Sequence, residues 1–309
     1  MYHVFGPVPS RRLGMSLGID LIPYKTCSYD CIYCELGKTT HKTTIRKEYF
    51  SKDLVLTQLA EYLPILDSPP DYITISGSGE PTLNSEIGAI ISAIKQMTAI
   101  PVAVITNSSL LFMDEVKEAL VGADIVLPSL DAVSSLVFRY INRPDPSLDI
   151  NEINNGLIDF RKEFTGQIWL EILLCRVAND DPVEVERMRA KIEKIKPDKV
   201  HVNTVVRPPS EDFAYPLSEK KLNSLREMLG VRAEIISGII PSGRGTHFKD
   251  NEEKIISLIA RRPCTFDDIC RVLALHSNET VKYLDKLVKE GRILYKLHDH
   301  HMYYQVANI

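Results

Sequence analysis

The chain has 309 residues, 44% of them hydrophobic and 25% charged, and a formal net charge of −4. This composition is ordinary for a folded globular protein, and the length allows one large domain or a large and a small one. The slightly acidic balance argues against a protein that coats nucleic acid or a membrane through bulk charge. No apolar run of about 18 residues occurs and the first residues lack a signal-peptide pattern, so we expect no membrane contact and a cytoplasmic location.

Strand-like and helix-like segments alternate between residues 15 and 236. The expected strands are 15–23, 71–77, 101–106, 124–130, 167–175 and 199–206, with a short last strand at 232–236. The expected helices are 51–63, 84–96, 113–120, 132–140, 150–163, 182–195 and 218–229. Such alternation is typical of a parallel sheet with right-handed crossovers. It predicts an α/β domain over residues 1–236, a partial (β/α)6 TIM barrel with its active site at the carboxyl ends of the strands.

A second, smaller domain is expected after a Gly- and Pro-rich linker at 237–250. Residues 251–309 predict helices at 252–260, 265–273 and 277–290 and a hairpin of 292–297 with 302–306, an order that resembles a winged helix-turn-helix. This segment has nine Lys/Arg and eight Asp/Glu, which is less basic than a DNA reader. We expect it to bind a partner without touching the cofactor site.

Three cysteines follow the first expected strand with the spacing C-x3-C-x2-C. Cys27, Cys31 and Cys34 lie within eight residues, and such a loop can ligate three irons of a [4Fe-4S] cluster. The fourth iron then stays open to a substrate or cofactor. A zinc site of these thiols with His41 is an alternative, but structural zinc usually draws its ligands as two separated pairs. A disulfide framework is not expected without a secretory signal.

Polar and glycine residues follow two later strands. The turn Ser76-Gly-Ser-Gly-Glu-Pro81 comes directly after the second strand, and its glycines allow a ligand to approach the backbone. Glu80 offers an acceptor for an ammonium group, although an ordinary turn between strand and helix has a similar composition. Ser129 and Asp131 end the fourth strand, where they either bind a ligand or cap the next helix.

The cysteine spacing, Tyr33 before the last cysteine and the Gly-Glu-Pro turn together resemble the radical S-adenosylmethionine (radical SAM) superfamily. The one departure is Ser78, where many members have glycine. The resemblance implies that Cys27, Cys31 and Cys34 hold a [4Fe-4S] cluster whose open iron chelates S-adenosylmethionine. It also implies cofactor contacts by Tyr33 at the adenine, by Gly77, Gly79 and Glu80 at the methionyl group, and by Ser129 and Asp131 at the ribose and carboxylate. A reductant such as flavodoxin or ferredoxin would supply the electron that cleaves the cofactor to methionine and a 5′-deoxyadenosyl radical.

The N-terminal segment carries a second resemblance. Gly6-Pro-Val-Pro-Ser-Arg-Arg-Leu-Gly14, Ser16-Leu-Gly-Ile-Asp20 and Cys31-Ile-Tyr-Cys-Glu-Leu-Gly37 look like Fe–S oxidoreductases related to the wyosine base synthases, which rebuild a tRNA guanine. The upstream cysteines of a second cluster are absent. We therefore expect a radical SAM oxidoreductase that modifies an RNA base or a peptide or protein residue. The alternative is a non-enzymatic Fe–S regulator that binds DNA through the winged helix.

Several other polar and charged residues are weaker candidates for contact with a substrate. Arg11 and Arg12 could contact a carboxylate or phosphate, or form a structural ion pair. Strand-end residues that could reach substrate are Glu171, Arg176, Asn203 and Arg207, with rim ion pairing as the alternative for each. The basic group Lys38, His41, Lys42, Arg46 and Lys47 could meet an anionic substrate, but a solvated loop is the simpler reading. Cys175 is expected in the core, and the histidines at 298, 300 and 301 in a polar turn.

Overall fold

The computed structural model describes residues 3–66, 68–236, 251–273, 275 and 277–307. Within them, the main sheet has the strand order β1 (Val4–Ser10), β2 (Gly14–Ile19), β5 (Tyr72–Ile75), β6 (Val102–Thr106), β7 (Ile125–Pro128), β8 (Gln167–Leu174), β9 (Lys199–Thr204) and β10 (Ala233–Ile235). Strands β2 to β10 are parallel, and β1 is antiparallel to β2. The predicted parallel sheet is confirmed, including its short last strand. The predicted linker at 237–250 lies outside the described residues.

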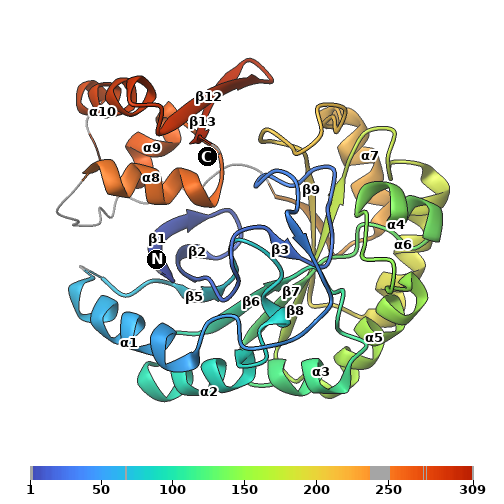
Figure 1. Cartoon of the computed structure of the whole chain (residues 1–309). Helices are drawn as coiled ribbons and strands as arrows, with labels where there is room; N and C mark the ends of the chain where they lie inside the picture. Colours follow the sequence, from blue (N-terminus) through green and yellow to red (C-terminus); the bar gives the residue numbers. More distant parts are fainter. Residues whose placement is uncertain (1–2, 67, 237–250, 274, 276, 308–309) are drawn as a thin grey trace.

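Helices cover the outer face of this curved sheet (Figure 1). They are α1 (Lys52–Tyr62), α2 (Ile87–Met97), α3 (Asp114–Leu120), α4 (Ser135–Ile141), α5 (Ile150–Glu163), α6 (Pro182–Ile195) and α7 (Glu219–Leu229), with short 3-10 turns η1 (Leu63–Ile65) and η2 (Pro81–Leu83). The arrangement is a partial barrel. Its strands are buried on both faces, which explains their nearly continuous apolar sequences such as Ile-Val-Leu in β7.

Strand β1 was not predicted from the sequence. Gly6, Pro7 and Pro9 interrupt its apolar pattern, and proline is tolerated only because β1 lies at the edge of the sheet. The strand pairs with β2 from Val4 opposite Ile19 to Ser10 opposite Gly14. It therefore closes one side of the barrel and presents Val8 to the small domain, where Val8 packs against the apolar core.

The small domain contains three helices and a three-stranded sheet among its described residues. The elements are α8 (Asn251–Arg261), β11 (Cys264–Thr265), α9 (Phe266–Leu273), α10 (Ser277–Lys289), β12 (Ile293–His298) and β13 (His301–Val306), with the sheet order β11-β13-β12. Thr265 and Asp268 form a capping box: the Asp268 amide donates to Thr265 Oγ1 at 3.1 Å and the Thr265 amide to Asp268 Oδ2 at 3.2 Å. Strand β11 was missed because two residues show no periodicity.

The small domain contacts the barrel at two places. Helix α8 lies beside β1 (Figure 1), and the Arg261 guanidinium stacks on the Phe5 ring at 4.3 Å and pairs with Asp20. At the other place, the Tyr303 hydroxyl donates to the Val206 carbonyl at 2.8 Å, and Lys296, which is opposite Tyr303 in the hairpin, pairs with Asp212 at 2.6 Å. The small domain is therefore docked on the mouth of the barrel, and its expected lack of contact with the cofactor stays a prediction.

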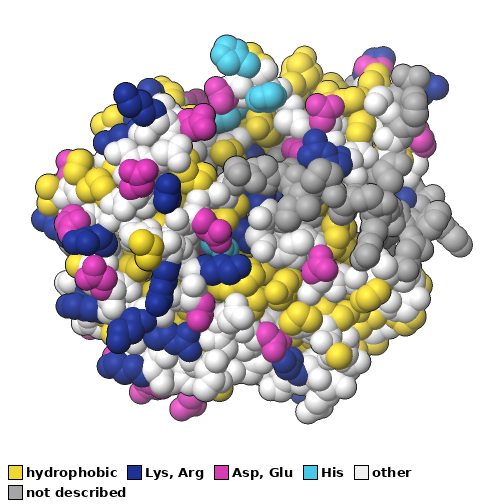
Figure 2. All heavy atoms as spheres, turned by 180° about the vertical axis from the view of Figure 1, so that it is seen from behind, with side chains coloured by type: hydrophobic (Ala, Val, Ile, Leu, Met, Phe, Trp, Pro, Cys, Tyr) yellow, Lys and Arg dark blue, Asp and Glu magenta, His cyan; other side chains and the backbone are white. Residues whose placement is uncertain are grey.

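On the face opposite to that of Figure 1, Lys/Arg and Asp/Glu side chains are scattered among hydrophobic and other side chains (Figure 2). This pattern agrees with the nearly balanced charge of the chain. None of the described helices has the length and apolar character that crossing a membrane requires.

Candidate functional site

A cavity of about 840 Å³ opens between the carboxyl ends of the strands and the small domain. Of the residues predicted from the sequence, it is lined by Cys27, Tyr33, Cys34, Gly77, Gly79, Glu80, Ser129 and Asp131. Cys31 belongs to the same loop but does not line the cavity, because its side chain faces Asn142. Segments far apart in the sequence are thus brought to one site, as expected for the strand ends of a barrel.

Each cysteine sulfur accepts a hydrogen bond from a different segment. Lys25 Nζ donates to Cys34 Sγ at 3.2 Å, Asn107 Nδ2 to Cys27 Sγ at 3.5 Å, and Asn142 Nδ2 to Cys31 Sγ at 3.4 Å. Donors to the sulfurs of an iron–sulfur cluster tune its reduction potential and orient its ligands. The asparagine donors had no predicted role, and no sequence motif marks them.

The Cys27 and Cys31 thiols lie in a buried environment that disfavours free thiolates. Burial raises the pKa of Cys27 to about 12, with the nearby Glu80 charge as a second cause, and raises that of Cys31 well above its usual range. Thiolates here therefore need cations beside them. Within the described residues no three His, Cys, Asp or Glu side chains converge on one metal ion, and His41 is exposed on the short strand β4 (His41–Lys42). The zinc alternative is therefore not supported.

The glycine-rich turn is packed directly against the cysteine loop. A Cβ atom on Gly79 would lie 1.8 Å from the Thr26 carbonyl oxygen, and one on Gly77, whose φ is +148°, would lie 2.5 Å from the Asp20 carboxyl group. The Lys25 amide donates to the Ser78 carbonyl at 2.7 Å. Glycine is therefore required by backbone packing in the turn itself, as well as for the approach of a ligand.

The Glu80 carboxylate is buried and joins the turn to strand β6. Its Oε1 accepts from the Thr82 amide at 3.1 Å, the Thr82 hydroxyl at 2.6 Å and the Thr106 hydroxyl at 2.7 Å, while Oε2 accepts from the Asn107 amide at 2.7 Å. Burial raises the pKa of Glu80 against the opposing effect of these donors. Oε2, with one protein donor, keeps acceptor capacity toward the cavity.

Asp131 connects strand β7, strand β8 and the cysteine loop. Its Oδ1 accepts from the Leu173 amide at 3.0 Å, and its Oδ2 from Asn142 Nδ2 at 3.0 Å and from the Tyr33 hydroxyl. The alternative that Asp131 caps the next helix is wrong. The Glu184 carboxylate on α6 takes that place, accepting from the amides of Val133 and Ser134 at 2.6 and 2.8 Å before α4.

The sequence profile of the radical SAM superfamily matches residues 21–188, which include the cysteine loop, the glycine-rich turn and Asp131. The chain belongs to the radical SAM superfamily. Proteins of this superfamily use a [4Fe-4S] cluster and S-adenosylmethionine, and the chain is an enzyme. The alternative of a non-enzymatic regulator is therefore not supported.

Similar proteins match most of the chain. A UPF0026 protein of Methanocaldococcus jannaschii is 32% identical over 98% of this chain and 96% of its own length. A protein named GTPase Obg from Brachyspira hyodysenteriae is 39% identical over 94% of this chain, but the chain spans only 43% of that protein. The crystal structure of Streptococcus suis SuiB bound to S-adenosylmethionine has a TM-score of 0.53 at 13% identity, over 72% of this chain and 50% of that one. This last likeness concerns the fold.

Some of the weaker site residues predicted from the sequence line the cavity, and others lie outside it. Glu171, Asn203 and Arg207 line the cavity, together with Arg11 and Arg12, whereas Arg176 lies outside and stacks on Tyr215 at 4.8 Å. The basic group after the cysteine loop lies outside the cavity, and its members Lys38 and Arg46 pair with Glu211 and Glu115 at 3.3 and 2.7 Å. Cys175 is fully buried in the core, as predicted.

Proposed function

We propose that this radical SAM enzyme binds its [4Fe-4S] cluster through Cys27, Cys31 and Cys34 and modifies a macromolecule, either an RNA base or a peptide or protein residue. When bound, the cluster and S-adenosylmethionine supply a 5′-deoxyadenosyl radical that abstracts a hydrogen atom. One observation carries the proposal: a single cavity holds the cysteine loop, the glycine-rich turn and the polar strand ends, and the small domain forms its opposite wall.

Different residues of the chain would bind different parts of S-adenosylmethionine. Gly77 and Gly79 would let the methionyl group approach the backbone, and Glu80 Oε2 would accept from its ammonium group. Tyr33 would flank the adenine, and its hydrogen bond to Asp131 fixes its hydroxyl group. Ser129 and Asp131 would face the ribose and carboxylate. The surrounding barrel excludes water and holds the reacting atoms in place.

The small domain supports a macromolecular substrate. Its three helices and β11-β13-β12 sheet resemble a winged helix, and we propose the division 1–236 for the barrel, 237–250 for the linker and 251–309 for this domain. Basic residues on α10 are partly neutralised, since Lys286 pairs with Glu252 and Lys289 with Asp285, both at 2.6 Å. A partner bound by shape and specific contacts suits this surface better than bulk DNA. A flavodoxin or ferredoxin in the cytoplasm would be the reductant.

The cluster and its chemistry are tested with anaerobically reconstituted protein. We expect about four iron atoms per chain, and formation of 5′-deoxyadenosine from S-adenosylmethionine after reduction with dithionite. Cys31→Ala should lose both the cluster and the cleavage, whereas the control Cys270→Ala, in α9, should keep both. A full complement of iron in the Cys31→Ala protein would contradict the ligand assignment.

The substrate class is tested by stimulation of 5′-deoxyadenosine formation. Total RNA and total protein fractions from the source cells are added separately, each before and after treatment with RNase or protease. If RNase or protease treatment abolishes the stimulation, the substrate is a macromolecule, and the effective enzyme identifies it as RNA or protein. A stimulation that survives both treatments and passes a small-pore dialysis membrane would show a small-molecule substrate.

A further inference from the structure

The cavity is lined by five arginines: Arg11, Arg12, Arg207, Arg261 and Arg262. Three of them are paired within the chain. Arg12 Nε lies 2.7 Å from Glu171 Oε1, Arg207 Nη1 lies 3.0 Å from Glu35 Oε1, and Arg261 pairs with Asp20. Within the described part of the chain, Arg11 and Arg262 form no ion pair, and the buried Nη2 atom of Arg262 has no hydrogen-bond partner. The Arg262 side chain also lies within reach of the Cys264 thiol.

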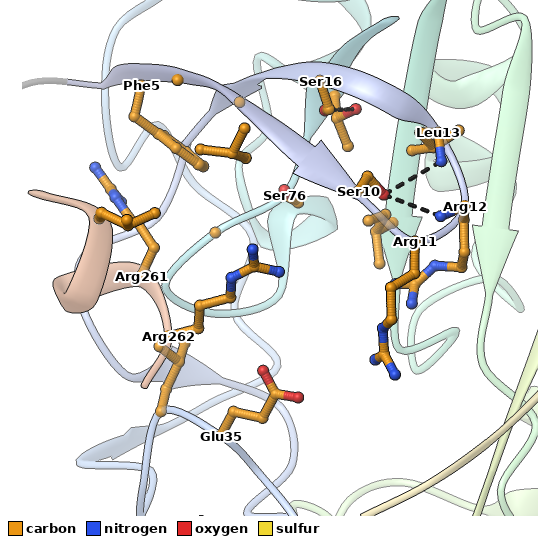
Figure 3. Close-up of a pocket in the computed structure, with 18 of the residues that line it drawn as sticks. Phe5, Ser10, Arg11, Arg12, Leu13, Ser16, Glu35, Ser76, Arg261 and Arg262 are labelled. Carbon is orange, nitrogen blue, oxygen red and sulfur yellow. Dashed lines mark hydrogen bonds between the residues drawn. The ribbon is translucent and has the colours of Figure 1, made fainter. Parts of the chain in front are cut away.

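These two arginines come from different parts of the molecule and face one space. Arg11 lies in the turn between β1 and β2, and Arg262 directly follows α8 of the small domain. Figure 3 shows their side chains extending into the cavity from opposite sides, near the Glu35 carboxylate. Glu35 is next to Cys34, so the space between the two guanidinium groups borders the cysteine loop.

The charges around this space do not balance. Glu35 is already hydrogen-bonded to Arg207 Nη1 at 3.0 and 3.1 Å, and the Asp268 carboxylate, which faces Arg207 from α9, accepts from the Thr265 amide. The same Glu35 carboxylate also interacts electrostatically with Arg11 and Arg262, so one anion faces three guanidinium groups. Burial lowers the pKa of Arg11 to about 10 against the opposing charge of Glu35, and the nearby Arg207 and Arg12 add to the lowering. Unpaired buried charge is unfavourable, so a site of this kind is built for an anion.

We propose that Arg11 and Arg262 bind a phosphate group of the substrate at the seam between the β1–β2 turn and the small domain. A carboxylate offers two oxygens in one plane and is satisfied by a single guanidinium fork. A phosphate group offers oxygens in several directions and can accept from two forks that arrive from opposite sides. The inference rests on the proposed function, because it names the anchoring group of that substrate, and it favours RNA over protein.

The position of the site gives it a function in substrate orientation. A phosphate bound there would hold the substrate beside the loop of Cys34 and would bridge the barrel to the small domain. The nucleotide attached to that phosphate would then enter the cavity toward the glycine-rich turn, which lines the same space. This geometry also gives the small domain a direct part in substrate binding.

The test is a calorimetric titration of the cluster-loaded, unreduced, full-length protein with inorganic phosphate at constant ionic strength. We expect Arg11→Gln and Arg262→Gln each to weaken phosphate binding by at least about tenfold, the loss expected for a charged hydrogen-bonded contact. The control Arg189→Gln, on the outer face of α6 where Arg189 pairs with Glu186, should bind phosphate as the wild type does.

A thermal unfolding series separates binding from folding. Phosphate should raise the melting temperature of the wild type and of Arg189→Gln, but not that of Arg11→Gln or Arg262→Gln. Without phosphate these two variants should be at least as stable as the wild type, because each removes an uncompensated charge. A loss of stability without phosphate in both variants would show that the two arginines have a structural role, and would overturn the proposal.

Three results of the titration would also overturn it. Absence of phosphate binding to the wild type would remove the site, even if 5′-deoxyadenosine formation succeeds. Acetate binding as tightly as phosphate would show a carboxylate site. Competitive displacement of phosphate by S-adenosylmethionine would show that the guanidinium groups serve the carboxylate of the cofactor. Success of the cleavage assay with any of these results leaves the proposed radical chemistry intact.

Discussion

At the scale of single residues, the Glu80 carboxylate determines how the glycine-rich turn meets strand β6. Four protein donors converge on it, and the Asn107 amide is the only one on Oε2 within the described residues. In Glu80→Gln an amide nitrogen would face either this N–H or the three donors of Oε1. We expect a loss of about 1–3 kcal/mol in the free energy of unfolding, measured with urea on the cluster-free protein.

Binding of S-adenosylmethionine should weaken in the same variant, because the acceptor proposed for the ammonium group is lost. Glu118→Gln is the matched control, since Glu118 is exposed on the outer helix α3. Unchanged stability in Glu80→Gln would show that the four hydrogen bonds contribute little, and unchanged cofactor affinity would remove Glu80 from the cofactor site.

The difference in stability between wild type and Glu80→Gln should change with pH in one direction. Because burial raises the pKa of Glu80 above its ordinary value of 4.5, the folded state binds a proton more tightly than the unfolded state. The stability that protonated Glu80 contributes is fully present below pH 4.5 and is lost as the pH rises through the raised pKa of the folded state. The deficit of Glu80→Gln relative to wild type should therefore shrink between pH 4.5 and neutral pH. A deficit that grows with pH would mean that hydrogen bonding to the charged form exceeds desolvation.

The cysteine ligand set could be predicted at this scale because its members are neighbours in the sequence. The side chains that support it could not. Asn107 is 80 residues from Cys27, and Asn142 is 111 residues from Cys31. Arg262 likewise reaches the cavity only because the small domain docks on the barrel. Contacts of this kind depend on the tertiary fold, and no spacing rule identifies them.

At the scale of elements, the glycine-rich turn and the cysteine loop form one packed unit. The Gly79 backbone lies against the Thr26 carbonyl, and the next amide, that of Glu80, donates to the same oxygen at 3.3 Å. Strand β3 (Thr26–Cys27) is in turn paired in parallel with β4, which fixes both ends of the cysteine loop. The turn therefore positions the loop even before a cofactor binds.

Gly79→Ala tests this unit. The new methyl group would meet backbone, which cannot move aside as a flexible side chain can, so we expect a loss of stability of at least about 1–3 kcal/mol. The loop should shift with it, and less iron should be retained after reconstitution. Gly122→Ala is the control, because its methyl group would meet only the Ile91 side chain, at 3.2 Å. Full iron content and wild-type stability in Gly79→Ala would contradict the close packing of turn and loop.

Elements with strong end signals were predicted well. Helices α5 and α6 have the predicted bounds, with Asp149 and Asp181 as N-caps, and Ser51 and Ser218 cap α1 and α7. Helix α2 begins at Ile87 rather than Asn84, because η2 precedes it and the Asn84 side chain bonds the carbonyls of Leu21 and Phe50 at 3.0 Å. Local propensity cannot foresee such tertiary anchoring.

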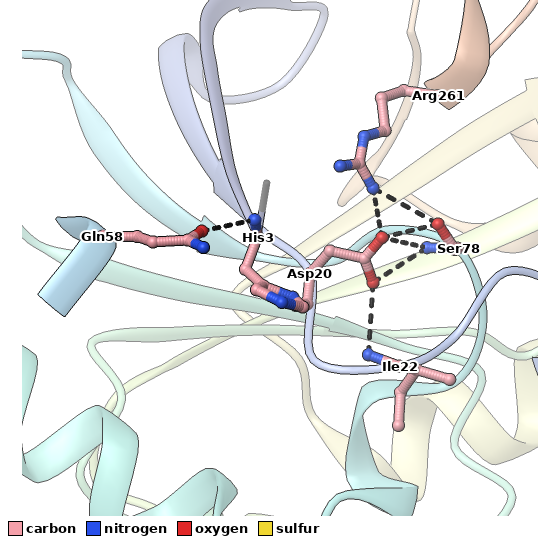
Figure 4. Close-up of polar contacts among 6 residues, drawn as sticks. All are labelled: His3, Asp20, Ile22, Gln58, Ser78 and Arg261. Atoms are coloured by element: carbon pink, nitrogen blue, oxygen red, sulfur yellow. Dashed lines mark hydrogen bonds and ion pairs between the residues drawn. The ribbon is translucent and has the colours of Figure 1, made fainter. Parts of the chain in front are cut away.

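At the scale of the whole molecule, one ion pair links the small domain to the cofactor turn. Arg261 of α8 pairs with the buried Asp20, and Asp20 accepts from the Ser78 amide at 3.2 Å and from the Ser78 hydroxyl at 2.5 Å (Figure 4). Ser78 lies between the two turn glycines. Arg261 Nη1 also donates to the Ser78 hydroxyl at 3.3 Å, so docking of the small domain is connected to the turn both directly and through the Asp20 carboxylate (Figure 4).

A double-mutant cycle on Arg261 and Asp20 tests this connection. Arg261→Gln and Asp20→Asn should each destabilise the protein, and the double variant by less than their sum, with a coupling energy of about 0.5–3 kcal/mol. Arg261→Gln should also lower the affinity for S-adenosylmethionine, because Asp20 then holds Ser78 less firmly. The control Lys296→Gln removes an exposed ion pair with Asp212 at the barrel interface, and we expect almost no effect on either quantity. Unchanged cofactor affinity in Arg261→Gln, together with a normal coupling energy, would show that the pair docks the domain without ordering the turn.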